Sequence, residues 1–302
     1  MLLVTIWPLF ALICLGFALA RAGFPSAEFW PAAERINYLV LFPALLVSNL
    51  VAAPLADPAI WRLGGAAAVT ICGAAALLWL ARRIRPHPAA RFGPSLQGIV
   101  RFNTYLGLAV IASLGVSGGL ERASVYLAVG VPLVNVLAIM GLSEGSILRS
   151  PGLLLRTMGR NPLILACVVG IALALSGLGL PFGTDRLLSL LAQASLPLGL
   201  LCVGAALRPE ALRRDVGALF WISGLRLLVM PVFAFGVAQL FGLTGPEAVV
   251  LVTFSAIPTA PSAYVLTRQL NGDASLMAGL VTAQTMAAVL TIPLILMMLG
   301  LG

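Results

Sequence analysis

The chain contains no lysine and few charged residues of any kind. Only 9% of its 302 residues are charged, and arginine alone supplies the positive charge behind the formal net charge of +8. Soluble domains have roughly 25% charged residues, so this composition excludes a soluble globular domain. A basic chain can bind nucleic acid, but these arginines are scattered beside apolar runs, where they indicate membrane topology and no nucleic-acid partner.

Histidine and cysteine are scarce as well. The single histidine, His87, lies in a basic loop at residues 82–91, where the sequence offers no catalytic or metal-binding partner for it. The cysteines occur in separate apolar runs without paired spacing: Cys14, Cys72, Cys167 and Cys202. We interpret them as small buried residues, neither disulfides nor metal ligands, and we predict no bound cofactor.

Long apolar runs dominate the rest of the sequence, in which 61% of residues are hydrophobic. Runs of about 20 residues span the ~30 Å hydrocarbon core when helical. The expected spans are residues 1–20, 36–53, 63–81, 98–119, 123–142, 162–180, 187–207, 216–240, 248–270 and 276–299. They predict an all-α polytopic protein with ten transmembrane helices in a lipid bilayer. The first run has a small-residue pattern like a signal-peptide cleavage site, but no positive charge precedes it, so we expect a retained helix.

The ninth run is interrupted by two prolines, Pro258 and Pro261, which have no N–H. The carbonyls that they would have bonded, those of Phe254 and Ile257, therefore lose their helical partners. In lipid, a bare carbonyl costs several kcal/mol unless protein, water or a ligand satisfies it. A helix broken at the midplane is a common binding site in secondary transporters. A proline kink that neighbouring helices satisfy is the structural alternative.

The two halves of the chain align weakly with each other. An offset of 151 positions places residues 103–107 on residues 254–258. Because each half has an odd number of spans, the halves must be inverted relative to each other. We predict a first five-helix repeat at 1–143, a cytoplasmic connector at 144–161 and a second five-helix repeat at 162–302.

Arginine is distributed unequally between the two sets of loops. Loops after the odd-numbered spans hold Arg21, Arg35, Arg82, Arg83, Arg85, Arg91, Arg149, Arg156, Arg160, Arg208, Arg213, Arg214 and Arg268. The opposite loops hold only Arg62, Arg122 and Arg186. The positive-inside rule places the arginine-rich loops in the cytoplasm and both termini outside.

Four short motifs add a family resemblance. NTYLGL at 103–108, NPLIL at 161–165, RLLVMP at 226–231 and IPTAP at 257–261 resemble bacterial permeases of the auxin efflux carrier family. That family belongs to the bile-acid/arsenite/riboflavin transporter superfamily. One departure is Leu108-Ala109, where family members often have a proline after the glycine of span four.

The resemblance implies a fold and a mechanism. Spans four and nine would be unwound and would cross at the membrane centre. Spans one, two, six and seven would form a scaffold, and spans three to five and eight to ten would form a mobile transport unit with elevator-type alternating access. A bacterial-type inner membrane and a homodimer through spans two and seven are expected. The implied substrates are small organic anions such as malate, malonate or auxin-like acids.

We place the substrate site where spans four and nine would cross. The predicted residues are Asn103, Thr104, Gly107, Ile257, Pro258, Thr259, Pro261, Ser262 and Arg226. The amide of Asn103 can donate and accept, although an interhelical hydrogen bond is its structural alternative. Arg226 lies about 18 Å beyond Arg214 along a helix, near the midplane. It either attracts a substrate carboxylate or braces the carbonyls that the prolines free.

Acidic residues are missing from the predicted spans. All ten lie in expected loops or at helix ends: Glu28, Glu34, Asp57, Glu121, Glu144, Asp185, Glu210, Asp215, Glu247 and Asp273. A proton relay in a membrane needs an ionisable group at depth. No carboxylate relay is therefore predicted, while Na⁺ or H⁺ coupling, uniport and exchange all stay open.

Other function classes are less compatible with these residues. A membrane enzyme would need a nucleophile with a base, or a His/Glu metal set, at one depth, and we therefore predict no enzyme. A sodium-coupled carrier of another organic solute, in the bile-acid-type branch, is the main alternative to an organic-anion transporter. A channel or a membrane scaffold is the third interpretation.

Overall fold

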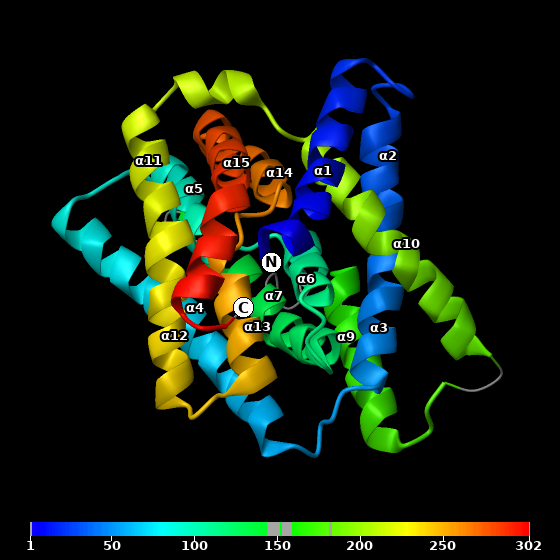
Figure 1. Ribbon diagram of the computed structural model, residues 1–302. Coiled ribbons are helices and arrows are strands. Elements are labelled where there is room, and N and C mark those ends of the chain that lie inside the picture. The colour runs from blue at the N-terminus through cyan, green and yellow to red at the C-terminus, as the bar shows by residue number, and fades with distance from the viewer. Residues whose placement is uncertain (1, 144–151, 153–158, 181–182, 302) are drawn as a thin grey trace.

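The computed structural model describes residues 2–143, 152, 159–180 and 183–301. Every regular element in these ranges is a helix, which confirms the predicted all-α class (Figure 1). Most of the predicted connector, residues 144–161, lies outside the described residues.

Seven helical segments in the described part of the chain are long and apolar enough to cross a membrane. Five are single helices: α1 (Leu2–Arg21), α4 (Pro58–Ile84), α7 (Gly119–Leu142), α10 (Thr184–Ala205) and α15 (Ala274–Met298). Two are composite segments, Phe29–Val51 and Val216–Leu240. The protein is therefore a multi-pass membrane protein, while the count of ten spans stays a prediction.

Both composite segments contain a widened, π-helical turn. The first consists of α2 (Phe29–Ile36), η1 (Asn37–Leu41) and α3 (Phe42–Val51). The second consists of α11 (Val216–Gly224), η4 (Leu225–Val229) and α12 (Met230–Leu240). Each widened turn ends close before a proline, Pro43 or Pro231. A proline lacks the N–H for one α-helical bond, which favours such a local change of hydrogen bonding.

The shorter helices complete the fold. They are α5 (Ala89–Val100), α6 (Thr104–Ser113), α9 (Pro162–Ser176), α13 (Gly245–Ala256) and α14 (Ser262–Gln269), with a short 3₁₀ turn, η3 (Pro209–Arg213). Of these, α9 and α13 are apolar but shorter than a full span.

The start of the second predicted span was wrong. The sequence predicted a helix from residue 36, but the helix begins at Phe29 and the apolar segment continues to Val51. Glu34 therefore lies inside this segment and not in a loop. The prediction failed because the span was taken to begin where the uninterrupted apolar run begins, after Glu34 and Arg35, whereas Glu34 lies within the helix and lines a cavity between helices.

The helices form two neighbouring groups (Figure 1). On one side, α1 packs along α10, and α3 packs along both α9 and α10. A Cβ atom on Gly204 would lie 1.9 Å from the backbone oxygen of Ile13, so glycine permits direct backbone contact between α1 and α10. On the other side lie α4, α5, α11, α12 and α15.

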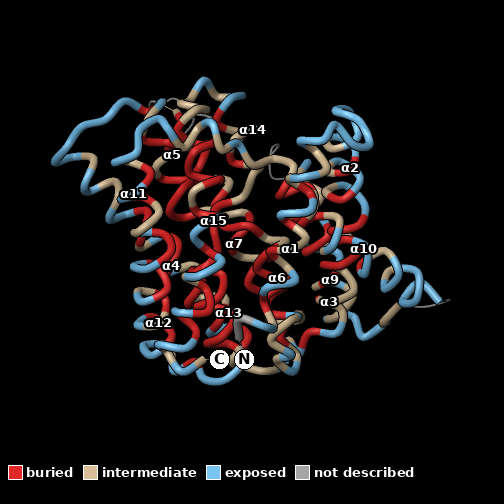
Figure 2. The backbone as a smooth tube through the Cα atoms, turned by 45° about the horizontal axis from the view of Figure 1, so that its top comes forward, coloured by how far each residue is buried: buried red, intermediate tan, exposed pale blue. Residues whose placement is uncertain are grey.

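Buried residues concentrate in the centre of the molecule, and both termini lie at the same end (Figure 2). The segment from Glu247 to Ala256 in α13 is buried throughout. All four cysteines are free. Cys14 and Cys72 are exposed, which corrects the expectation that all four are buried. A small apolar side chain is equally suited to a helix surface that faces lipid.

Candidate functional site

Two helical interruptions meet in the interior. The first is residues 101–103, between α5 and α6, and the second is residues 257–261, between α13 and α14. The backbone N–H of Asn103 donates to the carbonyl of Pro258 at 2.9 Å, which joins the two interruptions directly. The 151-residue offset places residues 101–103 on residues 252–254, several residues before the second interruption, so the structure leaves the repeat alignment a prediction.

The first interruption has no proline, and a side chain stabilises it instead. Asn103 has extended backbone angles, and its Oδ1 accepts a hydrogen bond from Leu106 N at 3.2 Å. This is helix N-capping, which satisfies one of the free N–H groups at the start of α6. Gly107 lies inside α6 and not in the break. A Cβ atom there would lie 2.6 Å from the ring of Phe254, so glycine allows α6 to approach α13.

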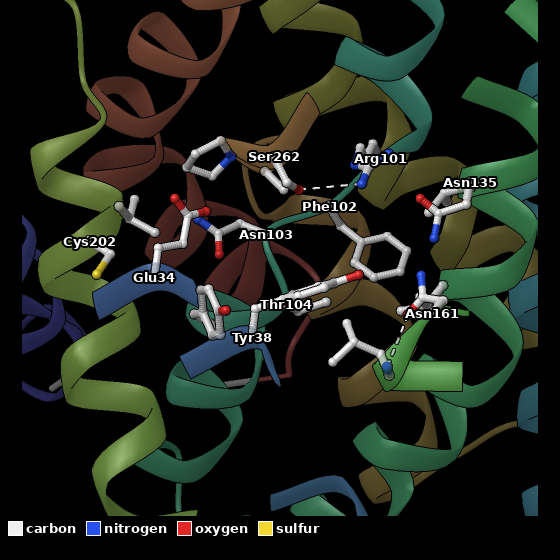
Figure 3. Close-up of a pocket in the computed structure, with 17 residues that line it drawn as sticks. Glu34, Tyr38, Arg101, Phe102, Asn103, Thr104, Asn135, Asn161, Cys202 and Ser262 are labelled. Carbon is white, nitrogen blue, oxygen red and sulfur yellow. Dashed lines mark hydrogen bonds between the residues drawn. The ribbon is translucent and has the colours of Figure 1, made fainter. Parts of the chain in front are cut away.

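A cavity of about 60 Å³ lies beside the two interruptions (Figure 3). Its lining combines residues from both interruptions with residues of α2, η1, α6, α7, α10 and the starts of α9 and α14. The polar or titratable lining residues are Glu34, Tyr38, Arg101, Asn103, Thr104, Tyr105, Asn135, Asn161, Cys202 and Ser262.

Two buried hydrogen-bond donors in this lining have no acceptor among the described residues. They are Nη1 of Arg101 and Nδ2 of Asn103. Asn103 is only 1% exposed, and the other terminal nitrogen of Arg101 donates to Ser262 Oγ at 3.3 Å. A buried donor without an acceptor costs ~1–3 kcal/mol, and more when it is charged. The cavity is therefore suited to a ligand with negatively charged acceptor atoms.

The predicted site residues separate into two groups. Asn103, Thr104, Pro261 and Ser262 line the cavity. The remaining predicted residues lie behind it and hold the interruptions together: Gly107, Arg226, Ile257, Pro258 and Thr259. The backbone N–H of Thr259 donates to the Gln284 side chain at 2.9 Å, and its hydroxyl donates to a backbone carbonyl of α5 at 3.2 Å.

Arg226 holds the backbone at the second interruption in place through hydrogen bonds. Its side chain is buried and donates to the carbonyls of Ile257 (2.7 Å), Ile99 (2.8 Å) and Phe254 (2.8 Å). Two of these are the carbonyls that Pro258 and Pro261 leave without helical partners. Each guanidinium nitrogen therefore already has an acceptor, and Arg226 is not part of the cavity lining.

Several lining residues were not among the predicted site residues, in particular Glu34, Arg101, Asn135 and Asn161. Two of them had usable sequence signals. Arg101 lies two residues before Asn103, and Asn161 begins one of the family motifs. Glu34 had no such signal because it was assigned to a loop.

A second cavity adjoins the first, and both are lined by Glu34, Cys202 and Pro261. It extends to the exposed Arg208. The guanidinium of Arg208 lies 4.5 Å from the centre of the Tyr264 ring and donates to its hydroxyl at 3.1 Å. Nearby on the surface, Arg21 donates to Glu210 and lowers the pKa of that carboxyl.

Comparison with known sequences identifies the family. Residues 1–296 match the family described as "Membrane transport protein". The chain belongs to this family. The match confirms the resemblance to the auxin efflux carrier family, and it identifies the protein as a membrane transporter and not an enzyme.

Three relatives are similar to this transporter, one over nearly the whole chain and two over about half of it. A Methanothermobacter thermautotrophicus protein named "Uncharacterized transporter" is 28% identical over 298 residues, or 96% of each chain. A Rhizobium meliloti protein named "Putative malonate transporter" is 27% identical over 168 residues, which cover 54% of this chain and 52% of that protein. A Methanocaldococcus jannaschii protein, also named an uncharacterized transporter, is 30% identical over 147 residues, 47% of each chain.

Proposed function

We propose that this transporter carries small organic anions, carboxylates such as malonate, malate or auxin-like acids, and binds them in the cavity beside Arg101. The observation that supports this most is the pair of buried donors, Arg101 Nη1 and Asn103 Nδ2, that line one cavity without protein acceptors. A guanidinium presents its N–H groups in a planar fork that matches a carboxylate. The name of the Rhizobium meliloti relative supports the same substrate class.

We propose in addition that the transporter has two inverted five-helix repeats. Two ion clusters support this. Arg122, at the start of α7, pairs with Glu247 of α13 and approaches Asp57 before α4, with 4.0 Å between the atoms of the last pair. Arg91, at the start of α5, pairs with Asp215 before α11 and approaches Asp273 before α15, with 3.8 Å between their atoms.

The two clusters involve equivalent helices of the proposed repeats. Helices α4, α7 and α13 belong to spans three, five and nine, and helices α11, α15 and α5 belong to spans eight, ten and four. Each span of one cluster is five spans away from its counterpart in the other. In Figure 1, α4 begins at the lower edge and α11 at the upper edge, as an inverted repeat requires.

These clusters also support an elevator mechanism. They join helices of the proposed transport unit to one another at both ends, so the unit can move as one body. The scaffold would comprise α1, α2, α3, α9 and α10, with the crossing of spans four and nine at the scaffold-facing side of the unit. Alternating access would then carry the cavity past the scaffold.

Orientation and assembly complete the proposal. The arginine-rich loops would face the cytoplasm of a bacterial-type inner membrane, with both termini outside. The common end of the two termini in Figure 2 is compatible with an even number of spans. A homodimer through spans two and seven would hold the scaffold still, and the mass of the protein in mild detergent tests it.

Binding of carboxylates to the purified transporter tests the proposed function. Malonate, malate and an auxin-like acid are titrated against the unaltered protein and Arg101→Gln. We expect at least ~10-fold weaker binding in the variant, because a hydrogen bond to a charged group contributes ~1.5–3 kcal/mol. Arg101→Lys should retain part of the affinity, since the charge remains but the fork is lost. Arg83→Gln, an exposed arginine at the end of α4, is the matched control.

Asn103→Asp gives an independent second variant. Aspartate is as good an N-cap as asparagine, so α6 should keep its start and the protein its thermal stability. The substitution removes the Nδ2 donor and introduces a negative charge, so carboxylate binding should be lost. Binding of all three acids with unchanged affinity in Arg101→Gln, or of none of them by the unaltered protein, would contradict the proposal.

A further inference from the structure

We propose that Glu34 couples transport to protons: it takes up one proton when a carboxylate binds beside Arg101 and releases it on the other side of the membrane. This inference rests on the proposed function and deepens it. Glu34 lies within the Phe29–Val51 segment and lines the substrate cavity. It is the one acidic side chain in the lining of that cavity, as far as the described residues define it.

The carboxylate of Glu34 has no partner of its own. It forms no ion pair or hydrogen bond with any described residue, although it is half-buried. Four other acidic residues each lie within 4.0 Å of an arginine. Asp57 and Glu247 lie beside Arg122, and Asp215 and Asp273 lie beside Arg91. Glu34 is thus a half-buried carboxylate inside an apolar segment, and no arginine among the described residues forms an ion pair with it. An ionisable group in such a segment is a candidate functional residue.

Other titratable groups face Glu34 from every element around it. In the substrate cavity they are Tyr38 on η1, Arg101 and Tyr105 near the first interruption, and Cys202 on α10. In the adjoining cavity they are Arg208 and Tyr264. The Arg208 guanidinium stacks on Tyr264 and Arg101 bonds to Ser262, and no ion pair among the described residues joins either arginine to Glu34. In Figure 3, Arg101 and Glu34 lie on opposite sides of the cavity.

The charges of the cavity link proton binding to substrate binding. An ionised Glu34 adds a negative charge to the lining of the same cavity and repels a carboxylate that binds beside Arg101. When Glu34 is protonated, Arg101 alone remains, and a singly charged carboxylate neutralises it. Like charges repel strongly where water is scarce. Binding of the anion therefore favours protonation of Glu34, and protonation of Glu34 favours binding of the anion.

The proton has a route to water. Glu34 lines both cavities, and the second reaches the exposed Arg208. A proton would pass from water to a carboxylate oxygen of Glu34, cross the membrane with the substrate and return to water on the other side. The only bond formed and broken is the O–H bond. Cotransport of one proton with a singly charged carboxylate moves no net charge, and with a doubly charged carboxylate such as malonate at neutral pH it moves one negative charge.

Proteoliposomes that contain the full-length transporter test this proposal, with radiolabelled malonate as the probe. Two assays are compared: counterflow at equal pH on both sides, and accumulation driven by a pH gradient with the interior alkaline. For the unaltered protein we expect both, with accumulation several-fold above the level without a gradient. Glu34→Gln should keep counterflow but lose the extra accumulation, because its neutral amide imitates the protonated acid permanently.

The control variant is Glu28→Gln. Glu28 is exposed and immediately precedes the same helix, and it is not part of either cavity lining. It should behave as the unaltered protein in both assays. Because all proteins experience the same gradient, any effect of pH on malonate itself cancels in the comparison.

Two results would overturn the role of Glu34. One is undiminished gradient-driven accumulation in Glu34→Gln. The other is loss of malonate binding by folded Glu34→Gln, because a permanently neutral side chain should favour binding of the anion. Absence of both binding and counterflow in the unaltered protein would instead overturn malonate as a substrate. These results are distinguishable.

Discussion

Two arginines beside the helical interruptions have opposite surroundings. An arginine at the centre of a membrane helix costs at least ~2.5–3.5 kcal/mol. Arg226 offsets this cost by donating to three carbonyls, two of which lack helical partners because of Pro258 and Pro261. Arg101 has one hydroxyl acceptor and a buried nitrogen without a protein acceptor. The first arginine is therefore a structural brace, and the second is available to a ligand.

This difference predicts opposite effects of the same substitution. Arg226→Gln should lower the thermal unfolding midpoint by roughly 5 °C or more, because buried carbonyls left without donors cost ~1–3 kcal/mol each. Arg101→Gln should change the midpoint little, since only one hydrogen bond to a hydroxyl is lost. Thermal unfolding of the detergent-purified proteins measures both. A midpoint for Arg226→Gln equal to that of the unaltered protein would show that Arg226 is not the brace.

At the scale of helices, close approach depends on a few glycines. Gly107 lets α6 approach α13 at the Phe254 ring, which is stacked on Tyr126 with 4.6 Å between ring centroids. The ring also meets Phe102 edge-on at 5.5 Å. Phe254 therefore has no free space to retreat into, and a side chain at position 107 would separate the two helices that carry the interruptions.

Gly107→Ala should destabilise the protein by ~1–3 kcal/mol, the usual cost of overpacking. The matched control is Gly236→Ala in α12, where an added Cβ would meet no atom within 4 Å. That variant should be neutral or slightly more stable, because alanine favours helix over glycine. Thermal unfolding of the two variants side by side decides the matter. Equal midpoints would mean that the contact with Phe254 adjusts without cost.

Only one of the two helical interruptions could be predicted from local sequence. The interruption at 257–261 could be predicted because proline lacks an N–H, a property of the residue itself. The interruption at 101–103 has no proline, and it depends on Asn103 bonding both to Leu106 and to Pro258. The second of these bonds joins residues far apart in the chain. No local pattern contains that information.

For the whole molecule, the unequal distribution of arginine predicts one orientation. His87→Cys, in the arginine-rich loop after α4, should react with a membrane-impermeant maleimide in inverted vesicles and not in intact cells. Ser117→Cys, in the exposed loop between α6 and α7, should show the reverse. Both are made in a background in which the exposed Cys14 and Cys72 are replaced by serine. Labelling of position 87 from outside intact cells would reverse the proposed topology.

The sequence by itself determined that this is an all-helical membrane protein, that it resembles a transporter family, and that residues near Pro258 interrupt a helix. Composition, hydropathy and proline chemistry are local properties, so they can be read without coordinates. Only the tertiary structure decided which polar side chains share a cavity. Arg101 and Glu34 became site residues, and Arg226 became a brace, because a buried polar group is defined by the partners that distant helices bring to it.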